Sequence, residues 1–435
     1  MWHELKLATS QPLLSLQSFL GMRNKRRLIR HVLLGSLLAF FSAQVLVISI
    51  LVGIDSWRKR NHLQGQFPRT RPAPVKVGDS EVQVYTYGED LYAAMLDTIR
   101  HAQKRVVLET FIWKDDAVGR QFKQELICAA ERGVEVYIIF DSFANLVVPR
   151  RFKRFPRLRC LHVLKYPIIS WPWIPFHLLS YARDHRKILV VDGQTAFVGG
   201  YNIGAAYATE WRDTHARITG PGAGEMENVF IDFWNAYRHR RSSELHGDGA
   251  RSWEPHISIH RNDPRMLIFP IRATYLEAFD RAQHHIYLTH AYFIPDGVVF
   301  QSLLAAAKRG VDVRILLPMT SNHVVADWLA RGYYEQCLQQ GIKLLLYQHA
   351  MVHAKTATID GVWSMIGTAN LDRLSLVGNF EVNVEFYSED LAQQMEEIFA
   401  TDSSNTRELS LQRWRRRSLW ERFAVAILTP LRQLL

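Results

Sequence analysis

The chain has 435 residues, of which 48% are hydrophobic, 22% charged and 11% aromatic. This balance is typical of a protein with a packed core, and it excludes a disordered, collagen-like or coiled-coil chain; the length suits two or three domains. The 53 Lys and Arg against 42 Asp and Glu give a formal charge of +11, which favours an anionic partner such as nucleic acid, an acidic membrane surface or a phosphate-bearing substrate.

The first predicted element is a membrane-spanning helix over 32–54, preceded by a basic segment, 1–31. Residues 32–54 carry no charge over 23 positions, or about 35 Å of helix, enough to cross a hydrocarbon core of about 30 Å. A buried core helix and a cleaved signal peptide are the alternatives, but core helices are rarely apolar on every face, and a basic cluster rather than a cleavage site follows at 57–60. Five basic residues on each flank leave the orientation open. The Pro-rich stretch that follows, within 55–75, is expected to be a semi-rigid linker.

From residue 76 onward, apolar β-branched runs alternate with helical stretches, which predicts an α/β fold. Residues 102–108 resemble 282–288, and residues 129–136 resemble 306–313. We therefore expect two tandem units, 76–245 and 263–400, related by a pseudo-twofold axis and joined by a linker at 246–262. The basic tail, 401–435, is expected to form an amphipathic helix on an anionic surface, with an ordinary packed terminal helix as the alternative.

One repeated motif carries the chemistry. The pattern H-x-K-x4-D-x6-G-[GT]-x-N occurs twice, 168 positions apart, and a carboxylate follows each histidine by 28 positions. The first copy contains His185, Lys187, Asp192, Asn202 and Asp213. The second contains His353, Lys355, Asp360, Asn370 and Glu381. A single H-x-K in a strand usually consists of solvent-exposed residues without a function, but two copies with identical spacing indicate function.

The motif residues suit attack on a phosphodiester. Histidine and lysine two positions apart lie on the same face of a strand, and the glycine turn brings the asparagine beside them. If the units pair about a twofold axis, one imidazole can attack phosphorus and form a phosphohistidine while the other transfers the proton. The catalytic candidates are His185, Lys187, Asp192, His353, Lys355 and Asp360.

The remaining roles follow from charge and strand parity. Lysine and asparagine donors hold the phosphate oxygens, and these candidates are Lys187, Asn202, Lys355 and Asn370. Asp213 and Glu381 are placed to orient a histidine by accepting its second ring N–H. The motif aspartates have the opposite strand parity, so we interpret them as structural members of the motif that bond the backbone or the neighbouring unit. No metal or other cofactor is expected, because ammonium groups beside the imidazoles would repel a cation and no carboxylate cluster accompanies them.

These residues resemble the phospholipase D superfamily, and within it the chain is most similar to bacterial cardiolipin synthases. The stretches TFIW (110–113), HRKILVVDG with GGYNIG (185–204) and WRDTH (211–215) carry the resemblance. It implies a pair of α/β/α sandwiches with the site between them, and His185 as nucleophile. The implied reaction is metal-independent transfer between two phosphatidylglycerol molecules, giving cardiolipin and glycerol. It also implies a bacterial inner-membrane enzyme, although better-known relatives with long N-termini have two spanning helices and this chain shows one.

Other functions stay open at this point. A phospholipase D that transfers to water would carry the same motifs, and so would a nuclease, although a spanning helix has no use on DNA and no nucleic-acid partner is expected. A non-catalytic membrane-binding protein would be expected to have degraded motifs. The aromatic stretch 166–181 is either a lipid-facing lip or an irregular piece of core. The acceptor alcohol, the side of the membrane and the oligomeric state are not determined by the sequence.

Overall fold

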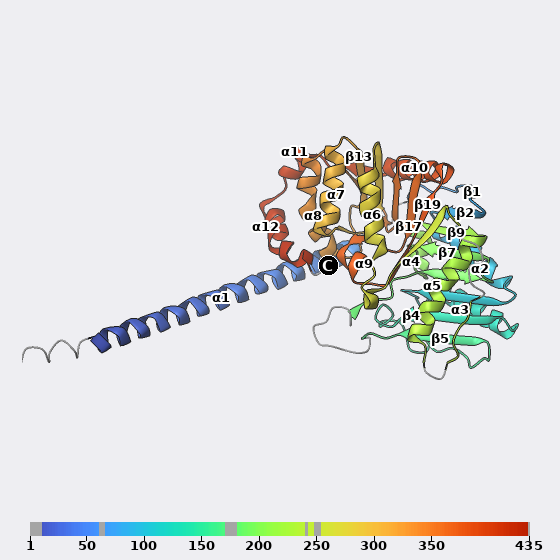
Figure 1. Ribbon diagram of the computed structural model, residues 1–435, viewed down its shortest axis with the longest axis horizontal. Helices are drawn as coiled ribbons and strands as arrows, with labels where there is room; N and C mark the ends of the chain where they lie inside the picture. The colour runs from blue at the N-terminus through green and yellow to red at the C-terminus, as the bar shows by residue number, and fades with distance from the viewer. Residues whose placement is uncertain (1–10, 61–65, 170–180, 240–241, 248–253, 434–435) are drawn as a thin grey trace, which may run out of the picture. The chain divides into compact units, whose positions relative to one another are not determined.

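The computed structural model describes residues 11–60, 66–169, 181–239, 242–247 and 254–433 (Figure 1). The chain divides into two compact parts. The helical part comprises residues 1–62 and 419–430, and the α/β part comprises residues 63–418 and 431–435. Most of the stretch 166–181, expected as a lip or a piece of core, lies outside the described residues.

One long helix dominates the helical part. Helix α1 runs from Gln11 to Arg60, and its section Ile29–Ile54 is long and apolar enough to cross a membrane. The predicted apolar helix at 32–54 is therefore present, but it continues into the stretches expected as a basic segment and a linker. Helix α12 (Leu419–Leu428) packs against it, and Gln44 donates a 3.0 Å hydrogen bond to the carbonyl of Ile427.

The first unit of the α/β part is an eight-stranded mixed sheet with helices on both faces. The strand order is β1-β2-β9-β7-β6-β3-β4-β5, in which β3, β4 and β5 are parallel neighbours. The strands are β1 Val75–Val77, β2 Ser80–Tyr85, β3 Arg105–Thr110, β4 Glu135–Asp141, β5 Leu161–Tyr166, β6 Ile188–Val191, β7 Thr195–Gly199 and β9 His215–Thr219. The helices are α2 Gly88–Arg100, α3 Ala117–Glu131, α4 Ala205–Thr209 and α5 Pro221–Tyr237.

The second unit repeats this plan. Its sheet has the order β10-β19-β17-β16-β11-β13-β14-β20. The strands are β10 Ile257–Asn262, β11 His285–His290, β13 Asp312–Pro318, β14 Lys343–Tyr347, β16 Lys355–Ile359, β17 Trp363–Gly367, β19 Glu381–Tyr387 and β20 Thr406–Glu408. The helices are η2 Pro264–Met266, α6 Pro270–Arg281, α7 Gly297–Lys308, α8 Val324–Gln339, α9 Arg373–Val377, α10 Glu389–Ser404, α11 Leu411–Arg415 and η3 Thr429–Gln433. Short strands β12 (Phe293–Ile294) and β18 (Leu371–Asp372) pair with each other.

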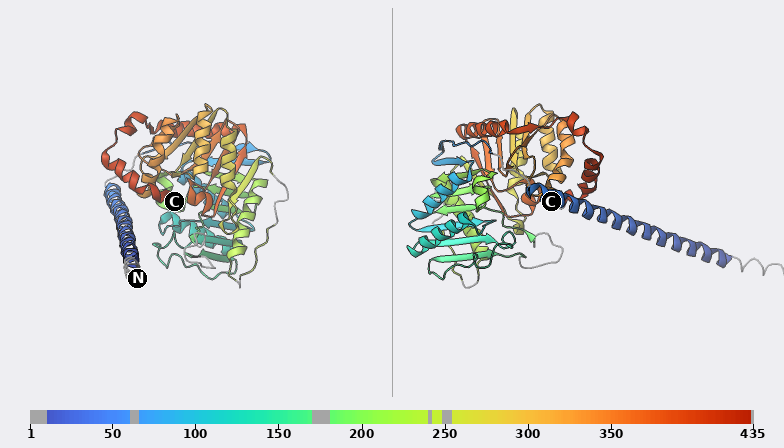
Figure 2. Two further views of the ribbon diagram at one scale, coloured as in Figure 1. Left: turned by 60° about the vertical axis from the view of Figure 1, so that its left-hand side comes forward. Right: turned by 180° about the vertical axis from the view of Figure 1, so that it is seen from behind.

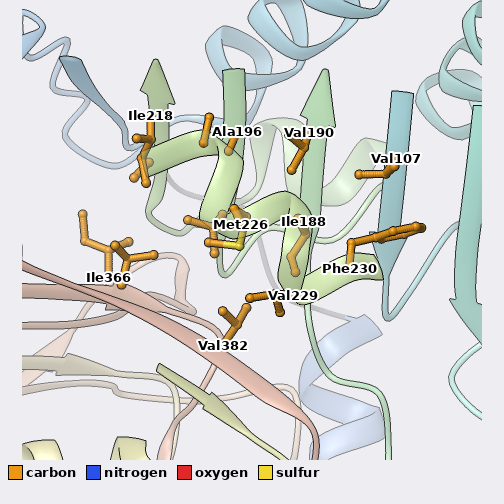
Figure 3. Close-up of a cluster of buried hydrophobic side chains, with 14 of the residues drawn as sticks. Val107, Ile188, Val190, Ala196, Ile218, Met226, Val229, Phe230, Ile366 and Val382 are labelled. Carbon is orange, nitrogen blue, oxygen red and sulfur yellow. The ribbon is translucent and has the colours of Figure 1, made fainter. Parts of the chain in front are cut away.

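Seven strands of one sheet have a counterpart in the same place in the other, from β2 and β10 to β5 and β14. The tandem α/β units predicted from the repeats are confirmed. The two units lie side by side (Figure 2), and a shared apolar core joins them. Figure 3 shows Met226 and Val229 of α5 between Ile188 of the first sheet and Val382 of the second, all four buried. Burial of this shared core fixes how the two units face each other.

Three boundaries differ from those expected. The stretch 66–75 is not a free spacer, because Phe67 is buried and the Arg69 guanidinium stacks 3.5 Å from the Tyr87 ring. Strand β10 lies inside the expected linker at 246–262 and pairs with β19. The expected tail from 401 begins inside α10, then adds β20 to the edge of the second sheet and buries Trp414 of α11. Edge strands and packed termini depend on distant partners, which local patterns do not reveal.

Candidate active site

The first motif lies at the entry to a buried strand. His185 and Lys187 immediately precede β6, whose four apolar residues pair with β3 and β7 in the middle of the first sheet. Lys187 is 2% exposed, and its ammonium donates to the carbonyl of His185 at 2.6 Å. Because β6 is buried on both faces, the polar side chains of the motif lie at its end, where they reach the boundary between the units.

The second motif occupies the matching place. His353 follows β15 (Met351–Val352), and Lys355 opens β16, which pairs with β11 and β17. Both side chains are buried, and the Lys355 ammonium lies 2.9 Å from Nδ1 of His353. The strands predicted at 188–191 and 355–359 are therefore present, with each histidine just before its strand.

Backbone contacts across the boundary show the pseudo-twofold relation directly. The amide of His185 donates to the carbonyl of Phe380 at 3.1 Å, and the amide of His353 donates to the carbonyl of Arg212 at 2.7 Å. Each acceptor stands 168 positions from the other, as the histidines do. The second contact belongs to a two-stranded pairing of β15 with β8 (Trp211–Arg212). The two copies of the motif thus meet at one place.

Each histidine is bound by a carboxylate of the other unit. Nδ1 of His353 lies 2.6 Å from Oδ2 of Asp213, and Nδ1 of His185 lies 3.0 Å from both oxygens of Glu381. The sequence places a carboxylate 28 positions after each histidine but does not indicate that the pairs are crossed. Because a carboxylate accepts the Nδ1–H, Nε2 of each ring is directed away from it and is available for chemistry.

The two carboxylates are held differently. A Cβ at Gly200 would lie 2.0 Å from Oδ1 of Asp213, so only glycine leaves room for that carboxylate. The equivalent residue in the second unit is Thr368, whose hydroxyl donates to Glu381. The first unit therefore combines the shorter acid, Asp213, with glycine, and the second unit combines the longer acid, Glu381, with threonine.

Burial lowers the pKa of both lysines and both histidines at the site, and for Lys187 and the two histidines a neighbouring positive charge lowers it further. Burial lowers the pKa of Lys187 to about 7 and that of Lys355 to about 8. Burial and the charge of Lys355 lower the pKa of His353 to about 3, although Asp213 opposes this. The pKa of His185 falls well below its usual value because of burial and the charges of Lys187 and Lys355. The charge of the lysine in the opposite unit thus contributes to lowering the pKa of each imidazole.

The pKa values of the two acids shift in opposite directions. Burial raises the pKa of Glu381 to about 8, with Lys187 opposing the rise. Burial also opposes ionisation of Asp213, but Lys355 and His353 outweigh it and lower the pKa of that carboxyl. The carboxyl of Glu381 is therefore harder to ionise than that of Asp213.

The two motif asparagines are both buried. Oδ1 of Asn202 accepts from the amide of Ile112 at 3.2 Å, which fixes the orientation of its carboxamide. Oδ1 of Asn370 is buried and has no hydrogen-bond partner among the residues that the structure describes. A buried carboxamide oxygen without a partner is costly unless a ligand or water completes it.

The motif aspartates lie elsewhere. Asp192 and Asp360 follow the far ends of β6 and β16, and both adopt left-handed backbone conformations, with φ of 55° and 54°. Asp192 accepts three backbone amides at the start of β3, and Asp360 accepts the matching three at the start of β11. This confirms the prediction of backbone bonding and corrects their inclusion among the catalytic candidates.

Sequence reasoning missed several side chains around the site. The Phe111 ring lies 4.7 Å from the His185 ring, and the Trp211 ring lies 5.1 Å from the His353 ring. Both aromatic residues lie in TFIW and WRDTH, the stretches that carry the family resemblance. The resemblance pointed to these stretches but assigned no role to the two rings. A buried bidentate ion pair between Arg212 and Asp402 ties β8, which ends just before Asp213, to α10.

The site has no feature of a metal centre. Within the described ranges of the chain, no three His, Cys, Asp or Glu side chains are grouped so that they could hold a metal ion. The carboxylates at the site are instead bound to imidazoles, and two ammonium groups supply the positive charge that a phosphate would meet.

Comparison with known proteins agrees with this geometry. A family model described as "Cardiolipin synthase, PLD-like domain" matches residues 95–234 and 275–403. The chain belongs to this phospholipase D-like family. Cardiolipin synthase of Staphylococcus aureus is 31% identical over 363 residues, which cover 80% of this chain and 72% of the relative. Cardiolipin synthase of Listeria monocytogenes is 30% identical over 368 residues, which cover 80% and 74%.

Solved structures share the two-unit architecture. Phosphatidylserine synthase of Haemophilus influenzae matches with a TM-score of 0.61 and 14% identity, over 81% of this chain and 92% of that one. Polyphosphate kinase of Porphyromonas gingivalis matches with a TM-score of 0.52 and 12% identity, over 85% and 57%. At these identities the matches show the fold of this chain and nothing more.

Proposed function

We propose that this member of the family is a membrane-anchored cardiolipin synthase that transfers a phosphatidyl group between two phosphatidylglycerol molecules. The observation that supports the proposal most directly is the crossed arrangement of two histidine–carboxylate pairs around two buried lysines. Such a pocket offers two imidazoles and a concentrated positive charge, which is what displacement at an anionic phosphorus requires. The apolar helix Ile29–Ile54 supports a place in the cell membrane.

The mechanism has two displacements at one phosphorus. Nε2 of His185 attacks the phosphorus of the first phosphatidylglycerol, and the bond to the departing glycerol breaks as His353 protonates that oxygen. His353 then accepts the proton of a hydroxyl on the second phosphatidylglycerol, whose oxygen attacks phosphorus and releases His185. Cardiolipin forms and the enzyme returns to its starting state.

The lysines adjust the imidazoles to this task. Their charges lower the pKa of both histidines. A phosphodiester between Lys187 and Lys355 would offset that charge, and protonation of one imidazole would then become favourable at neutral pH. The carboxamides of Asn202 and Asn370, both buried, are suited to donate to the same phosphate oxygens.

The test is turnover of labelled phosphatidylglycerol by the purified full-length protein in mixed micelles. We expect cardiolipin and glycerol in equal amounts, and we expect His185→Ala and His353→Ala each to abolish turnover. Phosphatidic acid as the main product would instead identify a hydrolase, and cleavage of oligonucleotides alone would identify a nuclease. Full activity in either histidine variant would contradict the paired-imidazole scheme.

The covalent step needs its own measurement. Quenching the reaction with labelled lipid in alkali should preserve an acid-labile phosphohistidine, which peptide mapping would locate at His185. A label on His353 would exchange the roles of the two histidines.

A further inference from the structure

Three loops of the α/β part expose apolar side chains instead of burying them. They follow β4, follow β5, and join β10 to α6. We call their exposed members the apolar loop surface: Phe143, Leu146, Val147, Ile168, Ile169, Met266, Leu267 and Ile268. Val147 is 83% exposed and Leu267 is 67% exposed. A group of large aliphatic side chains of this size is unusual on a soluble surface and marks an interaction site.

Two arginines connect the three loops. The guanidinium of Arg183 lies 5.6 Å from the rings of both Phe143 and Tyr166, and it donates to the carbonyl of Ile168 at 2.6 Å. The rings of Tyr166 and Tyr237 lie 4.9 Å apart. The guanidinium of Arg265 lies 4.7 Å from the Tyr237 ring. The three loops therefore lie close to one another, linked through Arg183, Tyr166, Tyr237 and Arg265.

This surface adjoins the first histidine. Asn145, between Phe143 and Leu146, donates to the carbonyl of Phe111 at 2.8 Å. The ring of Phe111 in turn lies 4.7 Å from that of His185. The loop after β4 is thus connected to the His185 ring through one residue, Phe111.

The stretch of chain that carries two of the three loops has charges of one sign. Residues 143–169 contain seven Lys and Arg and no Asp or Glu. Six of the seven are exposed, and none of them forms an ion pair with a described carboxylate: Arg150, Arg151, Arg154, Arg157, Arg159 and Lys165. Exposed aliphatic tips on a basic stretch of chain match a bilayer with anionic head groups, where the tips enter the acyl region and the cations meet phosphate.

We propose that the apolar loop surface inserts into an anionic bilayer and presents the lipid head group to His185, independently of α1. The inference deepens the proposed function, because it names the bilayer face from which that site takes its lipid. A nucleic acid would meet the cations but leave the aliphatic tips in water. A second copy of the chain would bring two basic surfaces together at an electrostatic cost.

Depth-dependent quenching tests the insertion on the full-length protein in liposomes. The native cysteines Cys128, Cys160 and Cys337 are replaced, and a single cysteine at Val147 carries an environment-sensitive fluorophore. The matched control is Val362, an apolar residue that is 46% exposed in the turn between β16 and β17, at the strand ends opposite His353. Quencher lipids carry the quenching group on the acyl chain, in bilayers with or without phosphatidylglycerol.

We expect quenching at Val147 to exceed that at Val362 at least fivefold, and only in anionic bilayers; label at Leu146 should behave as at Val147. Equal quenching at the two sites, or quenching that is unchanged in zwitterionic bilayers, would overturn the proposal. A spectral shift that depends on protein concentration in detergent would indicate a second copy and would also overturn it. None of these readouts requires turnover, so they stand or fall separately from the proposed reaction.

A kinetic measurement links insertion to substrate supply. Val147→Glu should lower the ratio of turnover on vesicles to turnover on short-chain phosphatidylglycerol dissolved as monomers by about tenfold. Val362→Glu should leave that ratio unchanged. An unchanged ratio in Val147→Glu would show that lipid reaches His185 by another route.

Discussion

Replacing Gly200 by alanine tests the crossed carboxylates most directly. The new Cβ would lie 2.0 Å from Oδ1 of Asp213, and real Cβ contacts are essentially never shorter than 3.0 Å. The backbone at this position is not left-handed, so alanine adds no conformational strain there. The only way to relieve the contact is to move the carboxylate, or the strand that carries it, by roughly 1 Å.

That displacement has a calculable effect on His353. The hydrogen bond from Nδ1 to Asp213 measures 2.6 Å, so a shift of about 1 Å stretches it beyond bonding distance. Misplacement of a catalytic group by about 1 Å costs on the order of a hundredfold in rate, or about 2.7 kcal/mol of transition-state stabilisation. We expect kcat of Gly200→Ala for cardiolipin formation to fall by that factor, with KM changed less.

Two further variants complete the experiment. Gly297→Ala is the control, because a Cβ there meets no atom within 4 Å. The double variant Gly200→Thr with Asp213→Glu transfers the pair of the second unit into the first, and it should recover part of the lost activity. Activity of Gly200→Ala within twofold of the native protein, at unchanged thermal stability, would refute the role assigned to Asp213.

Three other expectations follow from contacts described above. If Glu381 must be a carboxylate to hold Nδ1–H of His185, its pKa of about 8 predicts that turnover rises with pH towards that value, and Glu381→Gln should remove this rise. Because Lys187 and Lys355 have pKa values of about 7 and 8 and lose their charges over the same range, turnover should fall above pH 8 in both proteins. An identical pH profile in the native protein and in Glu381→Gln would contradict the role assigned to Glu381. Asp360→Asn should lower the free energy of unfolding by about 2 kcal/mol in a denaturant titration, because the carboxylate accepts hydrogen bonds from three backbone amides. The folded variant should keep its turnover. Loss of turnover at full stability would contradict a structural role. Gln44→Leu removes the hydrogen-bond donor to Ile427 and should weaken the packing of α12 against α1 by about 0.6–1.7 kcal/mol. The loss should be measured as faster amide hydrogen exchange in α12. Unchanged exchange would show that apolar contacts alone hold that helix.

The repeat made much of this architecture predictable. Helix, glycine and buried strand recur at fixed offsets, so the two α/β units and the strands beside His185 and His353 follow from local pattern. The edges do not follow, because whether β10 or β20 joins a sheet depends on pairing with β19 or β14, far away in the chain. Local pattern therefore defines the centres of the sheets better than their limits.

The same division applies to the site. Strand parity correctly separates Asp192 and Asp360 from the histidines, since parity is a local property. The assignment of Asp213 to His353 and of Glu381 to His185 is not local, because either acid could serve the histidine of its own unit at the same spacing. The aromatic neighbours Phe111 and Trp211 have no equivalents in the repeat, so symmetry could not reveal them.

The crossed pairs carry an evolutionary consequence. Since each half lends its acid to the histidine of the other, an unduplicated ancestor would have had to work as a symmetric dimer, with every residue serving twice. Fusion of two copies removed that constraint, and each position became free to change alone. Glycine opposite threonine, and aspartate opposite glutamate, are traces of that freedom, which lets one half of the site specialise for the lipid that gives and the other half for the lipid that receives.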